Sequence, residues 1–135
     1  MSRSGYVDDL DSKDWAMWRG RVASATRGKR GQEFLRDLLA ALDAMPVKEL
    51  VVGALEEGEE VCAVGALGRA RGIDMSKIDP EDGDQVGEVF DISPCLAKEV
   101  VYTNDEWVND TTPAHRWKRM REWVAKQIKS SEAAP

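Results

Sequence analysis

The sequence predicts a mainly α-helical protein, a single compact helical domain with at most one small β-hairpin. Three positions carry a capping side chain followed by proline, which is typical of a helix start. Apolar residues recur at helical spacing in three longer segments. With 135 residues, of which 42% are hydrophobic and 33% charged, the chain is long enough to bury one core.

The first helix is predicted over residues 13–26, where apolar residues repeat with the helical period. Asp11 or Ser12 can accept hydrogen bonds from its first turn and so serve as the N-cap. Its apolar stripe comprises Trp15, Trp18, Val22 and Ala25.

The second helix is predicted over residues 32–45, after Gly28 and Gly31 interrupt the pattern and before Pro46 ends it. Its apolar arc is wider than a surface helix needs, which predicts that this helix is the central and most buried one. The arc comprises Phe34, Leu35, Leu38, Leu39, Leu42 and Met45.

The middle of the chain is ambiguous between strand and helix. Residues 50–55 and 61–64 are short valine-rich runs, and the acidic segment 56–60 separates them. We predict a β-hairpin with an acidic tip. A continuous helix stays open as the alternative, because such short runs do not distinguish the two periods.

Further helices are predicted at Asp79-Pro80, Ser93-Pro94 and Thr112-Pro113. The short oxygen-bearing side chain accepts hydrogen bonds from the N–H groups of the first turn. Proline fits the first helical position, because an N–H there would have no partner within the helix. The helix at 79 is predicted to run to about residue 90. Its predicted inner face is Val86, Val89 and Phe90.

The last helix is predicted to run from Pro113 to about Lys129, leaving residues 130–135 as a flexible tail and residues 1–11 as an N-terminal arm. Its spacing matches that of the first helix, so we expect both to lie against the central helix or each other, with basic faces outward. Its stripe comprises Trp117, Met120, Val124 and Ile128.

Charge is divided into blocks along the chain. Residues 13–36 hold seven basic and two acidic residues, residues 112–135 hold six and two, and residues 37–111 hold eighteen acidic and five basic residues. Blocks of one sign select partners through their field and do not determine the fold. The sequence therefore predicts a basic helical pole joined to an acidic body.

The sequence carries no motif for a bound nucleotide. A phosphate-binding loop at Gly28-Lys29 would need glycine at position 23 and serine or threonine at position 30, where the chain has Ala23 and Arg30. Glycines at 65, 68 and 72 lack the dinucleotide spacing, and we interpret them as small residues of a packed helix.

Metal, nucleophilic and membrane patterns are also missing from the sequence. His115 is the single histidine, and Cys62 and Cys95 stand far apart in apolar contexts, which predicts small buried thiols without a disulfide. We expect no metal, no cofactor and no catalytic residue. Without a signal-peptide pattern or a long apolar run, the chain is predicted to be cytoplasmic, with no membrane contact.

Residues 67–78 have the pattern of a helix-turn-helix, with Gly72 at the turn. Pro80 would stop the second helix within a few residues, and the acidic residues after it would repel DNA phosphates. DNA reading by this segment is therefore disfavoured.

Two sets of candidate partner-binding residues remain. Trp123, which belongs to the second set, projects away from the stripe of its helix and fits either a wider core or a stacking surface. The acidic set is Glu56, Glu57, Glu59, Glu60, Asp79, Glu81, Asp82 and Asp84. The basic and aromatic set is Arg27, Lys29, Arg30, Arg116, Arg119, Trp123 and Lys126.

Several short segments are distinctive when taken together. They are residues 18–20, 28–38 (Gly-Lys-Arg-Gly-Gln-Glu-Phe-Leu-Arg-Asp-Leu), 41–46, 61–63, 70–75, 104–106, 112–113 and 116–117. In these segments the chain resembles small proteins encoded by tailed phages and by prophages of proteobacteria. That group has no established activity, so the resemblance assigns no site residue. It implies a phage gene product that acts in the host cytoplasm by binding host machinery.

These observations favour an interaction protein over an enzyme. In the leading hypothesis, the acidic surface binds a basic surface of a host protein or imitates nucleic acid. In the alternative, the basic pole binds nucleic-acid phosphates while Trp123 stacks on a base. The sequence leaves the identity of the partner and the oligomeric state open.

Overall fold

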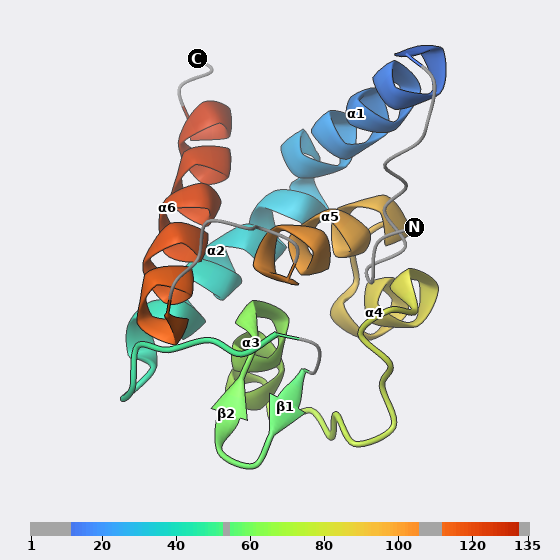
Figure 1. Ribbon diagram of the computed structural model, residues 1–135. Helices are drawn as coiled ribbons and strands as arrows, with labels where there is room; N and C mark the ends of the chain where they lie inside the picture. The colour runs from blue at the N-terminus through green and yellow to red at the C-terminus, as the bar shows by residue number, and fades with distance from the viewer. Residues whose placement is uncertain (1–11, 53–54, 106–111, 133–135) are drawn as a thin grey trace.

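Six helices and one hairpin make up the part of the chain that the computed structural model describes, which is residues 12–52, 55–105 and 112–132, with side chains for 16–52, 55–105 and 112–128. The predicted mainly α class with one small hairpin is confirmed. In chain order the elements are α1 (Ser12–Arg27), α2 (Lys29–Ala44), β1 (Glu56–Glu57), β2 (Glu60–Val61), α3 (Ala63–Ala70), α4 (Gly83–Phe90), α5 (Pro94–Asp105) and α6 (Pro113–Glu132) (Figure 1).

Helix α2 is the centre of the core, as its wide apolar arc predicts. Leu35, Leu38 and Leu42 are fully buried, and Phe34 packs edge-to-face on Phe90 of α4 with ring centroids 6.5 Å apart. Helices α3 and α6 both pack against α2. Because α2 buries large apolar side chains against several other elements, it lies at the centre of the hydrophobic core.

Helix α6 packs along α2 through the predicted stripe. Met120, Val124 and Ile128 are buried, and the half-buried Trp117 donates its indole N–H to the carbonyl oxygen of Leu42 at 3.1 Å. The predicted cap is also confirmed, because the Thr112 hydroxyl accepts a hydrogen bond from the His115 N–H at 3.0 Å. The helix continues to Glu132, three residues past the predicted end, so residues 130–132 are helical and not part of a tail.

Helix α1 packs against α5 and α2. The N-terminal end of α1 and the C-terminal end of α6 lie at the same end of the molecule but are spread apart (Figure 1). Val22 is buried, while Trp18 and Ala25 are half-buried. The predicted stripe is confirmed for these three residues. The side chain of Trp15, the N-cap candidate Asp11 and the predicted arm 1–11 lie outside the described residues.

The helix predicted from Asp79 begins four residues later, at Gly83. The Asp79 carboxylate accepts from the Glu81 N–H at 2.9 Å and so closes a local turn, while Asp82 caps α4 by accepting from the Gln85 N–H at 3.1 Å. Both aspartates are suitable caps, and the first is used for a turn instead. Val89 was predicted on the inner face and is 36% exposed, whereas Val86 and Phe90 are buried as predicted.

Helix α5 begins at the predicted position. The Ser93 hydroxyl accepts a hydrogen bond from the Leu96 N–H at 3.3 Å, and Pro94 is the first helical residue. Leu96, Val100 and Val101 are buried and close the core on the side of α4 and α1.

The predicted hairpin exists, but its strands are displaced. β1 and β2 pair antiparallel with Glu56 opposite Val61 and Glu57 opposite Glu60, and Gly58 in the turn has φ +65°. The acidic segment therefore forms the hairpin itself, and the predicted strand 61–64 ends after Val61 because Ala63 begins α3. Residues 50–52 are irregular, and residues 53–54 lie outside the described chain.

Helix α3 is the packed helix predicted for Gly65 and Gly68, but Gly72, which was predicted on the same helix, lies in the turn after it. All residues from Val61 to Gly68 are buried. Residues 71–82 form turns and irregular segments up to the start of α4, so no second helix follows the turn at Gly72 (φ +72°) and no helix-turn-helix is formed there. Among the described helices, none is long and apolar enough to cross a membrane.

An ion pair between α2 and α6 makes stability depend on pH. Asp43 accepts from two guanidinium nitrogens of Arg121 at 2.5 and 3.1 Å, and this hydrogen bonding lowers the pKa of Asp43 below its ordinary value of 3.8. The contribution of this ion pair to the free energy of unfolding is fully present above pH 3.8. It is lost as the pH falls through the folded-state pKa of Asp43.

We expect Asp43→Asn to lower the free energy of unfolding by about 0.2–1 kcal/mol at pH 7, the range for exposed ion pairs, because solvent screens both side chains. The difference from wild type should shrink as the pH is lowered through the folded-state pKa of Asp43. Urea unfolding of both proteins at a series of pH values measures this difference. A difference that stays constant down to the lowest pH would contradict the assignment.

Candidate functional site

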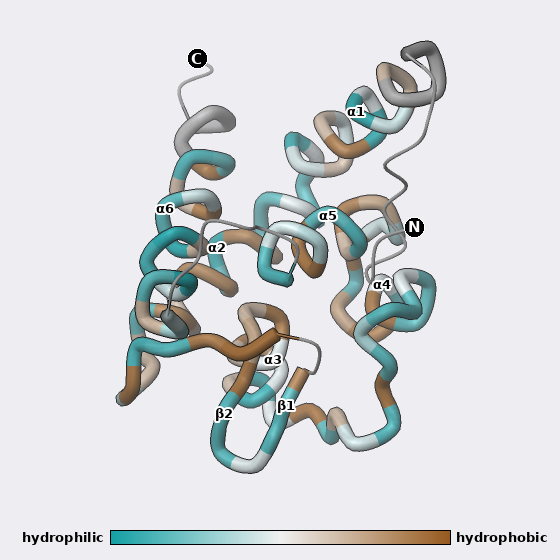
Figure 2. Tube along the Cα trace, in the orientation of Figure 1, coloured by the Kyte–Doolittle hydropathy of each residue, from teal (hydrophilic) through white to brown (hydrophobic). Residues whose placement is uncertain are grey.

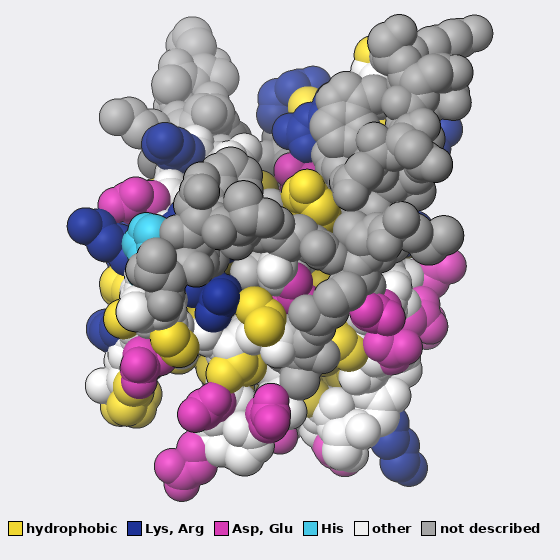
Figure 3. Space-filling view, viewed as in Figure 1, with side chains coloured by type: hydrophobic (Ala, Val, Ile, Leu, Met, Phe, Trp, Pro, Cys, Tyr) yellow, Lys and Arg dark blue, Asp and Glu magenta, His cyan; other side chains and the backbone are white. Residues whose placement is uncertain are grey.

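The hairpin presents three exposed carboxylates that have no cationic partner among the described residues. These are Glu57, Glu59 and Glu60, all of them exposed. At the lower edge of the molecule, where the hairpin lies in Figure 1, acidic side chains are seen beside hydrophobic ones (Figure 3). Glu57 and Glu60 are directly opposite each other in the two-stranded ladder. Like charges at such positions repel each other, so the site has a local excess of negative charge.

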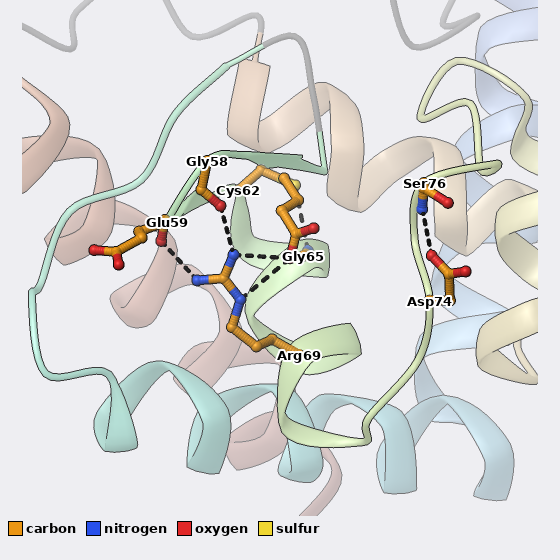
Figure 4. Close-up of polar contacts among 8 residues, drawn as sticks. Gly58, Glu59, Cys62, Gly65, Arg69, Asp74 and Ser76 are labelled. Atoms are coloured by element: carbon orange, nitrogen blue, oxygen red, sulfur yellow. Dashed lines mark hydrogen bonds and ion pairs between the residues drawn. The ribbon is translucent and has the colours of Figure 1, made fainter.

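Glu56 is not part of this free set, although the sequence placed it there. Its carboxylate pairs with Arg69 of α3, accepting from Nε at 3.2 Å and from Nη2 at 2.7 Å. Arg69 also donates to the carbonyl oxygens of Glu59 at 2.6 Å and Gly58 at 3.1 Å (Figure 4). The guanidinium therefore fastens the hairpin turn to α3, and the Glu59 carboxylate points away from it (Figure 4).

An open groove of about 790 Å³ lies between the hairpin, the C-terminal ends of α2 and α3, and the connection after α2. Its walls are mostly apolar, and Val47, which is 58% exposed, lies on its rim. The hydrophobic stretch before β1 and the hydrophilic hairpin turn are both visible in Figure 2. The apolar lining residues are Ala41, Ala44, Met45, Pro46, Val47, Val51, Val61, Ala66, Ala70 and Pro113.

Four carboxylates lie on this groove, namely Glu49, Glu57, Glu59 and Glu60. The sequence gives no signal for Glu49, because it is a single glutamate in a mixed segment and reaches the groove only when the connection after α2 folds back to the hairpin. Arg69 is the one cationic residue among the described lining residues. The combination of apolar walls and unpaired acids can bind a ligand that is both apolar and cationic.

The second predicted acidic group belongs to other elements. Asp79 and Glu81 lie in the turns before α4, Asp82 caps the helix, and Asp84 lies in its first turn. None of them lines the groove. The dipole of α4 and the turn hydrogen bonds explain these acids as features of a helix start.

The predicted basic and aromatic residues do not form one open surface. Arg116 donates to the carbonyl oxygen of Leu50 at 3.0 Å, and Arg119 donates to that of Asn104 at 3.4 Å, so both guanidinium groups serve internal contacts. Trp123 is half-buried and packs against the core. The remaining members are exposed, and they are Arg27, Lys29, Arg30 and Lys126.

The charge blocks are partly paired across the fold. Arg19 of the first basic block pairs with Glu99 at 2.8 Å, and Arg30 with Asp91 at 3.3 Å. The last basic block contributes the Arg121–Asp43 pair. The separation predicted from the sequence is therefore incomplete, and in the part of the chain that the structure describes the hairpin still places carboxylates without cationic partners beside an apolar groove.

The two cysteines are free thiols, as predicted, but Cys95 is only half-buried where the sequence predicted a buried residue. Cys62 is buried, and this burial raises the pKa of its thiol to about 12, so the reactive thiolate is not populated at neutral pH. Its sulfur accepts from the Gly65 N–H at 3.4 Å and caps α3 (Figure 4). Cys95 is half-buried beside Ser93, with the two side-chain heteroatoms 3.2 Å apart.

Within the described residues, no three histidine, cysteine, aspartate or glutamate side chains are placed to hold a metal ion. Comparison with models of protein families, with curated proteins and with solved structures gave no significant match. The site is therefore defined by its own geometry, an apolar groove with an acidic rim.

Proposed function

We propose that this chain is a small phage-type interaction protein whose acidic hairpin surface binds a host protein and modulates it. The observation that carries the proposal is the unpaired set Glu57, Glu59 and Glu60 beside the groove. Free carboxylates on a surface steer a basic partner toward it and raise the rate of association. The internal contacts of Arg116 and Arg119 make the nucleic-acid alternative the weaker one.

The test compares two triple variants that remove the same charge. Glu57→Gln/Glu59→Gln/Glu60→Gln removes the three unpaired charges of the hairpin and keeps Glu56, which forms an ion pair with Arg69. Glu33→Gln/Glu88→Gln/Glu122→Gln neutralises three exposed acids on α2, α4 and α6 that do not line the groove. Proteins captured from a proteobacterial lysate are identified by mass spectrometry, purified and titrated against wild type and both variants.

We expect the hairpin variant to bind the purified partner at least tenfold more weakly than wild type, and the control variant to bind within about twofold, since only hairpin charges face the partner. Equal binding by both variants would show that the hairpin acids do not take part. Nucleic acid that binds with a steep negative salt dependence, and is lost on Lys29→Glu/Arg30→Glu, would favour the basic pole instead.

A further inference from the structure

We propose that the groove between α2, α3 and the hairpin binds an amphipathic helix that presents an apolar face and carries lysine or arginine along one flank. This inference rests on the proposed function, because it names the part of the partner that the acidic surface recognises. It adds that the apolar groove, and not the charge alone, provides the binding site.

The shape of the groove suits a helix. Alanines of α2 (Ala41 and Ala44) and of α3 (Ala66 and Ala70) line its walls, and Arg69, the one long side chain that these helices contribute to the lining, is bonded to the hairpin. Its volume of about 790 Å³ is large enough for several apolar side chains. Helices bind such grooves by inserting residues at positions i, i+3, i+4 and i+7.

An added strand fits less well. β1 and β2 contain two residues each, so the hairpin edge offers too few backbone groups for an extended peptide to pair with. One side of β2 is already used, since the Val51 N–H donates to the carbonyl oxygen of Val61 at 3.0 Å. The apolar walls, and not a strand edge, are therefore the surface that is available to a partner.

The charge of the groove selects a cationic partner. Glu49, Glu57, Glu59 and Glu60 have no cationic partner among the described residues, and two of them repel each other across the ladder. Arg69 is already engaged, because it forms an ion pair with Glu56 and donates to the carbonyl oxygens of the hairpin turn. A lysine or arginine on the helix would relieve this repulsion, whereas an acidic helix would increase it.

The experiment uses a fluorescent peptide of about 18 residues, in which leucine follows the helical period and lysine fills the other positions. A second peptide has the same composition in an order without an apolar face, and a third replaces each lysine with glutamate. Binding to the full chain is measured by fluorescence anisotropy at low and moderate salt.

Two substitutions separate the groove from the charge. Ala44→Trp adds bulk at an exposed residue that lines the groove, and Ala16→Trp adds the same bulk at an exposed residue of α1 that does not. The hairpin triple variant serves as the charge arm. Circular dichroism and urea unfolding establish that each variant is folded before its binding is measured.

We expect wild type to bind the first peptide at least tenfold more tightly than the other two peptides. Ala44→Trp and the hairpin variant should each lose at least tenfold in affinity, and Ala16→Trp should stay within about twofold. The hairpin variant should also show a smaller salt dependence, because fewer charges attract the peptide.

Each opposing result has a distinct meaning. If the hairpin variant loses affinity while Ala44→Trp binds like wild type, the groove inference is wrong and the proposed function stands. If only Ala44→Trp loses affinity, acidic recognition is wrong, and the proposed function fails with it. Failure of wild type to prefer the first peptide overturns the inference, as does self-association of wild type that Ala44→Trp abolishes, because a second copy then fills the groove.

Discussion

Gly65→Ala is expected to lower the free energy of unfolding by about 1–3 kcal/mol, since overpacking of a closely packed site costs this order of energy. A methyl group at position 65 would lie 1.8 Å from the carbonyl oxygen and 2.7 Å from the carbonyl carbon of Leu55. That same oxygen accepts the Cys62 N–H at 3.1 Å. Moving Leu55 to make room would therefore break the bond that joins the base of the hairpin to the start of α3.

A matched control exists in the same type of element. Gly20 lies in α1, and a methyl group there would meet nothing within 4 Å. Gly20→Ala should raise the free energy of unfolding by about 0.5–1 kcal/mol, because alanine favours a helix more than glycine does. Urea denaturation followed by tryptophan fluorescence measures both proteins, and equal stabilities for the two variants would contradict the close approach at Gly65.

The second large effect is expected at Asn104, which is 1% exposed on α5. Its side-chain oxygen accepts from the Ala63 N–H at 3.1 Å, and its side-chain nitrogen donates to the carbonyl oxygen of Val51 at 3.0 Å. The residue thereby joins α5 to the first turn of α3 and to the segment before the hairpin. Asn104→Leu keeps the size of the side chain but leaves both backbone groups without these partners.

Because each buried group that loses its partner costs about 1–3 kcal/mol, we expect Asn104→Leu to lower the free energy of unfolding by about 2–5 kcal/mol. Thr103→Val is the control. Thr103 is also buried, but its hydroxyl bonds only to the Glu99 carbonyl oxygen, which keeps its helical partner. Chemical denaturation of both variants tests this, and a loss for Asn104→Leu no larger than that for Thr103→Val would show that the bridge does not stabilise the fold.

The candidate site was only partly predictable. Glu57, Glu59 and Glu60 could be selected from the sequence, because a run of like charge between apolar segments is visible there. The pairing of Glu56 with Arg69 could not, since it depends on how the hairpin folds over α3. The groove itself combines residues from segments as far apart as Ala41 and Pro113, and no local pattern indicates that they meet.

The fold shows the same division. Periodicity determined α2 as the core and the inward stripe of α6, and a capping side chain before proline located the starts of α5 and α6, because these signals lie within one or two turns of helix. The first turn of α3 is capped locally by Cys62, but it is also bonded by Asn104, which is 41 residues away. Local periodicity therefore determined which segments are helical and which face is buried. Tertiary contacts decided the strand positions, the charge pairs and the groove, because these depend on atoms brought together only when distant segments pack.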